Sequence, residues 1–286
     1  MTSPDRVAGR LVLVATPIGN LGDLSPRAVE SLRAADAIAC EDTRHTRKLL
    51  AHAAITGKRL LAVHEHNETD AAAGVVGLLE AGQTVALVTD AGTPAISDPG
   101  TKVVRAVLDA SFEVEAVPGP AALIVALIVS GLPSERFCFE GFLPRSGAAR
   151  KDRVSEISVE RRTVVMYEAP HRIIALLHDL VTACGAERRV SVSRELTKRF
   201  EQTWRGRLDD AVAGIGEPRG EYVVVLEGGA KQPTLIVDDA SVQTMIATHR
   251  AAGATTRDAV DAVTAATGRA RRDVYAIATT VSRPAP

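Results

Sequence analysis

The sequence predicts an α/β protein with two tandem α/β domains and a small C-terminal helical extension. Short apolar runs of four or five residues alternate with helical segments of about a dozen residues. This alternation is typical of a parallel sheet covered by helices on both faces. The sequence Gly-Leu-Pro-Ser at residues 131–134 is typical of a turn and divides the chain. We therefore expect domains at 1–131 and 132–229, and the extension at 238–286.

Five apolar runs are the expected strands of the first domain. Each is followed by a loop rich in Gly, Pro or charge, and ligands bind at the carboxyl ends of parallel strands. These loops are therefore the expected place for a site. The runs span residues 11–14, 37–40, 60–63, 85–88 and 114–117.

The loop at residues 88–100 contains two glycines and two prolines, which restrict its backbone and expose main-chain groups. Asp90, just past the strand, can accept hydrogen bonds from a ligand hydroxyl or ammonium group. The alternative is a tight connection whose polar side chains merely cap the next helix.

Two further loops of the first domain bear on the kind of ligand that the protein binds. Residues 15–23 contain glycine but match neither a phosphate-binding Walker loop nor Gly-x-Gly-x-x-Gly, which disfavours phosphate transfer. Ser25 and Pro26 then open a helix as N-cap and first residue. The charged run at 41–47 is expected to face a cleft or a partner subunit.

Metal binding and membrane insertion are not expected. His64 and His66 alternate at a strand end, but no third ligand is evident. Three widely separated cysteines indicate neither a disulfide framework nor a zinc site, and fit a reduced cytoplasm. No apolar run is long enough to span a bilayer.

Four more strands are expected in the second domain, at 137–141, 163–167, 189–193 and 222–226, with a helix at 173–184. Its loops at 167–172 and 194–201 are rich in polar residues. Two α/β domains in tandem make a cleft between them, a common location for small-molecule sites.

The extension contains a capping-box pattern at 255–258, then Gly268, then a last helix with a basic entry. A helix-turn-helix nucleic-acid module and a plain helical bundle explain this pattern equally well. Arg271 and Arg272, at that entry, are candidate RNA contacts.

Charge is unevenly distributed along a chain of almost neutral composition. Residues 1–131 carry 11 Lys and Arg against 15 Asp and Glu, and residues 142–207 carry 14 against 8. Arginine contacts to phosphates are favoured over base stacking, because only 3% of residues are aromatic. The candidate phosphate contacts, which could equally form a solvated charged face, are Arg145, Arg150, Lys151 and Arg153.

Taken together, the loop sequences resemble the ribosomal RNA small-subunit methyltransferase I family, within the tetrapyrrole methylase superfamily. The resemblance runs from about residue 11 to 228, and its strength lies in the order of seven motifs. These are ATPIGNLGD (15–23), EDTR (41–44), TDAGTPAISDPG (89–100), PGPAA (118–122), YEAPHR (167–172), RELTK (194–198) and GEYV (220–223).

The resemblance implies S-adenosylmethionine-dependent methylation of a ribose 2′-hydroxyl, on a cytidine in the decoding region of 16S rRNA in the 30S subunit. It also implies two α/β domains of the tetrapyrrole methylase type, with the methyl donor bound in the cleft between them, and a homodimer. Ala121 and Ala169 stand where the family pattern has serine. By motif, the donor site would comprise Pro17, Asp90, Gly92, Thr93, Ala121, Ala122, Tyr167, Leu196 and Thr197.

A ribose hydroxyl is a poor nucleophile and benefits from a base or from a cation beside its developing alkoxide. The candidates for these roles are Lys198, Glu195, Arg194, Glu41 and Arg44; salt bridges between domains or subunits are the alternative role. Two other functions remain open: a tetrapyrrole C-methyltransferase with the same fold and donor, and a non-catalytic RNA-binding ribosome-assembly factor.

Overall fold

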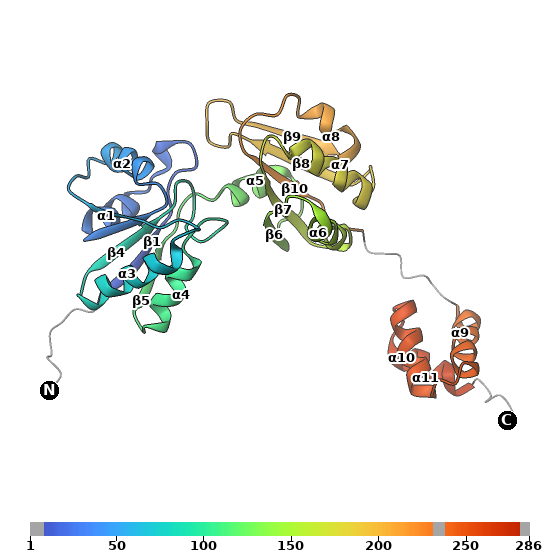
Figure 1. Cartoon of the computed structure of the whole chain (residues 1–286). Coiled ribbons are helices and arrows are strands. Elements are labelled where there is room, and N and C mark those ends of the chain that lie inside the picture. The colour runs from blue at the N-terminus through green and yellow to red at the C-terminus, as the bar shows by residue number, and fades with distance from the viewer. Residues whose placement is uncertain (1–8, 231–237, 281–286) are drawn as a thin grey trace, which may run out of the picture. The chain divides into compact units, whose positions relative to one another are not determined.

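The structure is a computed structural model that describes residues 9–230 and 238–280. It divides into two compact units, residues 1–229 and 230–286. The first unit contains two five-stranded sheets with their helices, and the second contains three helices (Figure 1).

The first sheet is entirely parallel, as the sequence predicted. Its strand order is β3-β2-β4-β1-β5, so β4 is central and the loops after β2, β4 and β1 emerge at one edge. All five expected strands are confirmed within one residue at each end. They are β1 (Arg10–Val14), β2 (Ala37–Cys40), β3 (Arg59–Ala62), β4 (Thr84–Val88) and β5 (Glu113–Val117).

Helices cover both faces of this sheet. Successive strand residues, such as Ile38 and Ala39, point to opposite faces and are buried in different apolar clusters. One cluster includes α1 and α2, and the other includes α3 and α4. Ser25 caps α1 with Pro26 as its first residue, as expected. The helices are α1 (Pro26–Ala34), α2 (Thr43–His52), α3 (Glu68–Glu80) and α4 (Thr101–Asp109).

The second sheet is mixed, in the order β6-β7-β10-β8-β9, and only β6 and β7 pair in parallel. The sequence did not predict β9, because this half-exposed edge strand, QTWRGR, has neither an apolar run nor a clean alternation. The strands are β6 (Phe137–Phe142), β7 (Thr163–Glu168), β8 (Arg189–Arg194), β9 (Gln202–Arg207) and β10 (Tyr222–Leu226).

Different helices cover the two faces of the second sheet. On one face lie α6 (Gly147–Val159), α7 (Ile173–Cys184) and α8 (Leu208–Gly214). On the other lies α5 (Ala122–Ser130), whose buried residues pack against β7 and β10. The helix that precedes the expected boundary at residue 131 thus completes the core of the second sheet.

The extension is a three-helix bundle of α9 (Asp239–Ala251), α10 (Thr256–Thr267) and α11 (Arg271–Thr280). Val242, Val260 and Val274, one from each helix, lie in a common apolar core. Thr255 caps α10 by accepting the N–H of Asp258, and Gly268 ends it in a left-handed conformation. No helix in the described ranges combines the length and apolarity needed to cross a membrane.

Candidate active site

The loop after β4 is tied to the loop after β1. Thr16 and Gly92 exchange two backbone hydrogen bonds, with N···O distances of 2.8 and 3.1 Å. The hydroxyl of buried Thr16 also donates to the carbonyl of Thr89 at 3.1 Å. The β1 loop is thereby held against the start of the loop that carries Asp90.

Hydrogen bonds also join this loop to those after β2 and β5. The backbone N–H of Asp42 donates to Asp90 Oδ1 at 3.1 Å, and the Thr93 hydroxyl donates to the Pro120 carbonyl at 3.1 Å. At the far end, Glu68 accepts the N–H groups of Gly100 and Lys102, both at 2.8 Å. The edge of the parallel sheet is therefore one hydrogen-bonded assembly.

Two loops have unusual backbone conformations. Among the described residues, four of the six non-glycine residues with positive φ lie in the loops after β4 and β8. These are Ala95 and Ser97 in the first loop, and Glu195 and Thr197 in the second. Such conformations persist only where surrounding contacts enforce them, and they cluster at functional sites.

Both loops border a cavity of about 300 Å³, at the lower end of the ~300–1,000 Å³ usual for small-molecule sites. Loops that follow strands of the first sheet and residues of the second sheet both line it. The lining comprises Ile18, Glu41, Asp90, Ala91, Gly92, Thr93, Ile96, Ser97, Asp98, Ala121, Ala122, Phe142, Tyr167, Glu195, Leu196, Lys198, Glu221, Tyr222 and Val223.

Most of the expected donor-site residues lie in this lining. Two do not: Pro17 is buried beside Ile18, and Thr197 lies between Leu196 and Lys198. The buried Thr197 hydroxyl oxygen lacks a hydrogen-bond partner among the described residues. The residues present in the lining are Asp90, Gly92, Thr93, Ala121, Ala122, Tyr167 and Leu196.

The candidate catalytic residues separate into two groups. Lys198 Nζ lies 2.9 Å from Glu195 Oε1, and both residues line the cavity with Glu41. Arg194 instead bonds Gln202 and the Glu217 carbonyl beside a different hollow.

Arg44 is likewise absent from the cavity. Its guanidinium is exposed and lies 2.8 Å from Asp42 Oδ2. Arg44 and Arg194 therefore lie outside the cavity lining, each bonded to polar partners near it in sequence or on the adjacent strand, and their catalytic role stays a prediction.

The sequence did not single out two carboxyl groups of the cavity, Asp98 and Glu221. Both lie within the quoted motifs, but nothing in their spacing shows that they face one site. Burial and the carboxylates of Glu41, Asp90 and Glu221 raise the pKa of Asp98 to about 6, although a hydrogen bond from Thr89 opposes the shift.

Tyr167 closes one side of the cavity. Its hydroxyl oxygen accepts the N–H of Leu123 at 3.1 Å, which fixes the first turn of α5. Burial raises the pKa of Tyr167 to about 12, so the phenol stays neutral under ordinary conditions. Phe139 and Phe142 contact the ring edge-on.

Arg150 does not belong to the exposed basic group in which the sequence placed it. Only 8% of the residue is exposed, and its guanidinium donates to Asp179 at 2.7 Å and to the Pro144 carbonyl at 3.1 Å. It also lies 3.8 Å from the fully buried carboxylate of Glu168. This burial argues against the RNA contact that the sequence predicted for Arg150.

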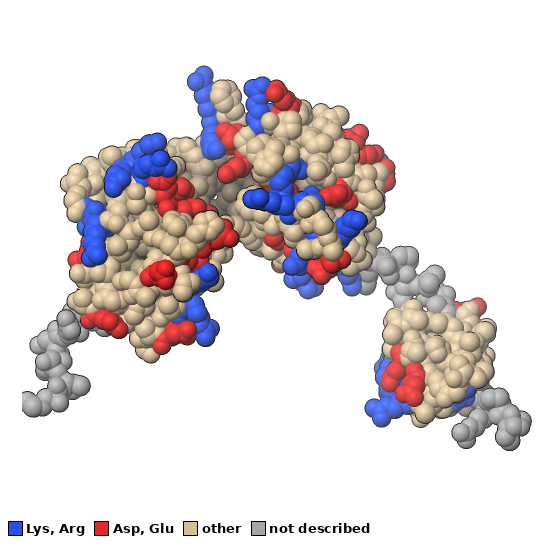
Figure 2. All heavy atoms as spheres, viewed as in Figure 1, with Lys and Arg blue, Asp and Glu red and all other residues tan. Residues whose placement is uncertain are grey.

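The other basic candidates are exposed. Arg145 and Lys151 have no ion-pair partner within the described residues, whereas Arg153 pairs with Glu156 and Glu140. On the visible face of the molecule, basic side chains are interspersed with acidic ones and form no continuous positive field (Figure 2).

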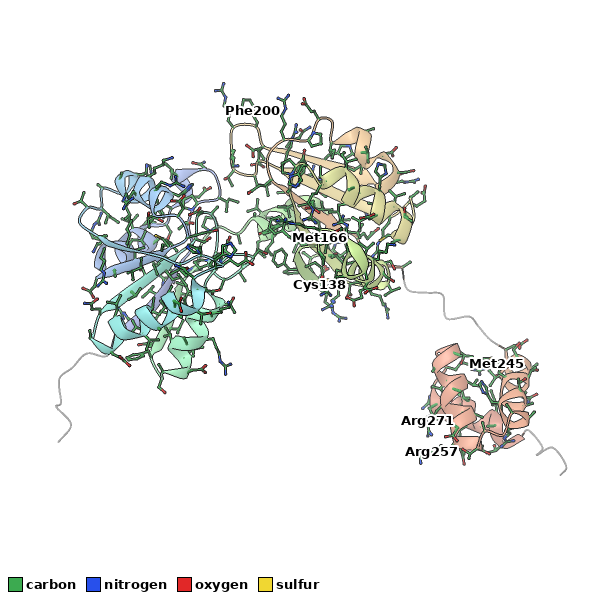
Figure 3. The ribbon with its side chains drawn as sticks, viewed as in Figure 1. Cys138, Met166, Phe200, Met245, Arg257 and Arg271 are labelled. Carbon is green, nitrogen blue, oxygen red and sulfur yellow. The ribbon has the colours of Figure 1, made fainter. Side chains whose placement is uncertain are left out.

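The basic entry of α11 is also partly neutralised. Arg271 pairs with Asp261 at 2.6 Å, and Arg272 with Asp273 at 3.2 Å. Arg271 and Arg257 project from one side of the three-helix bundle (Figure 3). The described residues contain no group of three or more His, Cys, Asp or Glu side chains suited to hold a metal ion.

Comparison with known proteins gives consistent results. Residues 10–212 match the family model of tetrapyrrole (corrin/porphyrin) methylases. The chain is 46% identical to a ribosomal RNA small subunit methyltransferase I from Synechocystis sp., over 93% of this chain and 96% of that protein. It is 52% identical to the protein of that name from Xylella fastidiosa, over 78% and 83% of the two chains.

The fold is similar to that of a solved structure, uroporphyrin-III C-methyltransferase from Thermus thermophilus complexed with S-adenosylhomocysteine. The TM-score is 0.55 with 18% identity, covering 76% of this chain and 96% of the other.

Proposed function

Because the chain belongs to the tetrapyrrole methylase family, and its relatives at 46–52% identity are small-subunit rRNA methyltransferases, we propose that it methylates rRNA with S-adenosylmethionine as donor. The acceptor in this proposal is the ribose 2′-hydroxyl of a cytidine in the decoding region of 16S rRNA. The single observation that carries the proposal is a cavity bordered by the strained loops after β4 and β8, the second of which carries Lys198.

The cavity fits this donor chemically. Its carboxyl groups suit a ligand with a sulfonium and an ammonium group, and its apolar residues, such as Ile18 and Leu196, suit a purine ring. Asp90, at the end of central strand β4, is the proposed partner of a donor hydroxyl or ammonium group. Backbone groups around Gly92 and Thr93 would contact the donor directly.

The bound donor supplies an electrophilic methyl group, and the protein supplies position and electrostatics. Lys198 is the proposed stabiliser of negative charge on the ribose oxygen, because its ammonium group lines the cavity and Glu195 holds it at 2.9 Å. Glu41 and Glu195 are the proposed proton acceptors. Gly19 lets the β1 loop approach Lys198, since a Cβ there would lie 2.4 Å from Lys198 Cγ.

We further propose that the protein acts in the cytoplasm as a homodimer. Ile124 and Ile128, one turn apart on α5, are 43% and 68% exposed, which is unusual for isoleucine on a helix that otherwise packs into a core. Light scattering measures the mass directly; a monomer across the micromolar range contradicts this part of the proposal.

The proposed function is tested with 30S subunits that lack the modification. Incubation with isotopically labelled S-adenosylmethionine should label 16S rRNA, and reverse transcription at low nucleotide concentration should stop at one cytidine. A porphyrinoid acceptor is assayed in parallel. Methylation of the porphyrinoid alone would establish the C-methyltransferase alternative, and donor binding with neither activity would contradict both enzyme assignments.

Asp90→Asn should weaken S-adenosylmethionine binding at least tenfold. Loss of a charge-assisted hydrogen bond costs about 1.5–3 kcal/mol, while the amide oxygen can still accept the N–H of Asp42. Calorimetric titration measures the affinity, with Asp109→Asn on exposed α4 as the control. Unchanged affinity in a folded Asp90→Asn protein removes Asp90 from the donor site.

Arg145→Ala combined with Lys151→Ala should weaken 30S binding and flatten the dependence of log affinity on log salt concentration. For each phosphate contact that is lost, the counterions stay on the RNA when the protein binds, and the magnitude of the slope falls by about 1. S-adenosylmethionine affinity should not change. If the salt slope equals that of wild type, these two residues form a solvated face and the Arg271–Arg272 region becomes the next candidate.

A further inference from the structure

The charge of the cavity lining is strongly one-sided. One basic side chain, Lys198, faces five carboxyl groups, and its ammonium group is already bonded to one of them, Glu195. Among the described residues, the other four carboxyls have no ion-pair partner; they are Glu41, Asp90, Asp98 and Glu221. Four unpaired carboxylates in one small cavity repel one another, and a proton on one of them relieves that repulsion.

The hydrogen bond of Thr89 distinguishes Glu41 from Asp98. The hydroxyl of Thr89, which is 3% exposed, donates to Glu41 Oε2 at 3.0 Å. The same hydroxyl is the neighbouring donor whose hydrogen bond would lower the pKa of Asp98. A hydroxyl has one proton, so it can donate to only one of the two carboxylates. While it donates to Glu41, the hydroxyl does not stabilise the ionised form of Asp98, so a proton is favoured on Asp98.

Asp98 is the better holder of this proton. It is partly buried on the loop after β4, and three carboxylates act on it: Asp90 from the same loop, Glu41 from the loop after β2 and Glu221 from the segment before β10. Lys198, the one cation of the lining, is engaged by Glu195. Burial and these like charges raise the pKa of Asp98 to about 6, within reach of physiological pH.

We propose that Asp98 makes the cavity prefer the positively charged methyl donor to the demethylated product: it holds a proton in the free protein and releases it to solvent when the sulfonium compound binds. S-Adenosylmethionine carries a net charge of about +1 and S-adenosylhomocysteine is about neutral near pH 6. Only the donor therefore stabilises the ionised Asp98 carboxylate. The inference depends on the proposed donor and not on the RNA acceptor.

The direction of the pH dependence follows from the linkage between proton and ligand binding. A cation lowers the pKa of Asp98, so donor binding expels protons and the donor affinity rises as pH increases through about 6. If ionised Asp98 binds the donor about tenfold better than protonated Asp98, donor affinity should increase about fivefold between pH 5 and 7. The product affinity should stay nearly constant over that range.

Calorimetric titration at pH 6 in buffers of different ionisation enthalpy measures the protons released. S-Adenosylmethionine should release about 0.4 proton per site, and S-adenosylhomocysteine close to none. Asp98→Asn should abolish the release and reduce the preference for donor over product about tenfold at pH 7. Asp109→Asn, which removes an exposed carboxylate of α4, should behave like wild type.

Glu221→Gln provides a second test that leaves Asp98 in place. Removing one of the repelling charges lowers the pKa of Asp98, so the midpoint of the affinity rise should move to lower pH. Equal proton release for donor and product, or release that persists in Asp98→Asn, overturns the inference while leaving the proposed function intact. Failure of wild type to bind S-adenosylmethionine would instead overturn the donor assignment itself.

Discussion

Lys198→Met should lower the turnover of 30S methylation by about 10²–10³ and change S-adenosylmethionine affinity less than threefold. Removal of one preorganised group that stabilises developing negative charge has an effect of this size. Lys198 lines the cavity beside Glu195, and its side chain is 39% exposed, so an incoming ribose can reach it. Single-turnover kinetics with saturating 30S particles separate the chemical step from binding.

Two variants distinguish a catalytic role of Lys198 from a general effect of positive charge on RNA binding. Lys198→Arg keeps the positive charge and should recover part of the rate, with 30S affinity as in wild type. Lys102→Met removes a similar charge from the solvent-exposed side of α4 and should leave turnover unchanged. If Lys198→Met weakens donor binding as much as it slows turnover, Lys198 is a donor-binding residue and the proposed stabilisation of the alkoxide is wrong.

The sequence predicted the parallel sheet well because each of its strands is an apolar run that ends in a marked loop. Most of the predicted donor-site residues also lie in the cavity lining, since motif order identified loops that the sheet then gathers at one edge. The sequence could not show that the carboxylates of Asp98 and Glu221 lie in one cavity and repel each other, because the two residues are more than a hundred positions apart in the sequence. Register and packing, not local pattern, bring those carboxyls together.

Helix α5 shows the same limit in a different form. Its nine residues are almost all apolar, so the sequence pattern does not indicate which face of the helix is buried. Leu123, Ala126 and Leu127 pack on the second sheet, although the helix follows the last strand of the first. The predicted boundary at residue 131 was placed at glycine and proline residues that are typical of a turn. Such residues carry no information about the sheet that the preceding helix covers.

Arg150 is the clearest case in which a local pattern misled. It lies in a run of basic residues that is typical of a solvated face, yet its three neighbours in space come from elsewhere in the chain. These are Asp179 at 2.7 Å, the Pro144 carbonyl at 3.1 Å and Glu168 at 3.8 Å. Glu168 is fully buried, and its Oε2 has no hydrogen-bond partner among the described residues.

Arg150→Met should therefore destabilise the first unit by about 3 kcal/mol, because removing one partner of a buried ion pair leaves an incompletely compensated charge. Arg172, 3.1 Å from Glu168 Oε1, still compensates the other carboxylate oxygen and limits the loss. Urea denaturation measures the change, with the adjacent exposed Lys151→Met expected within 0.5 kcal/mol of wild type.

A double-mutant cycle attributes the loss to the buried charge. Adding Glu168→Gln to Arg150→Met removes the uncompensated carboxylate, so the double variant should be less destabilised than the sum of the two single changes. Strict additivity would assign the effect of Arg150 to its bonds with Asp179 and Pro144. An Arg150→Met protein as stable as wild type, with weakened 30S binding, would return Arg150 to the RNA surface and contradict its buried position.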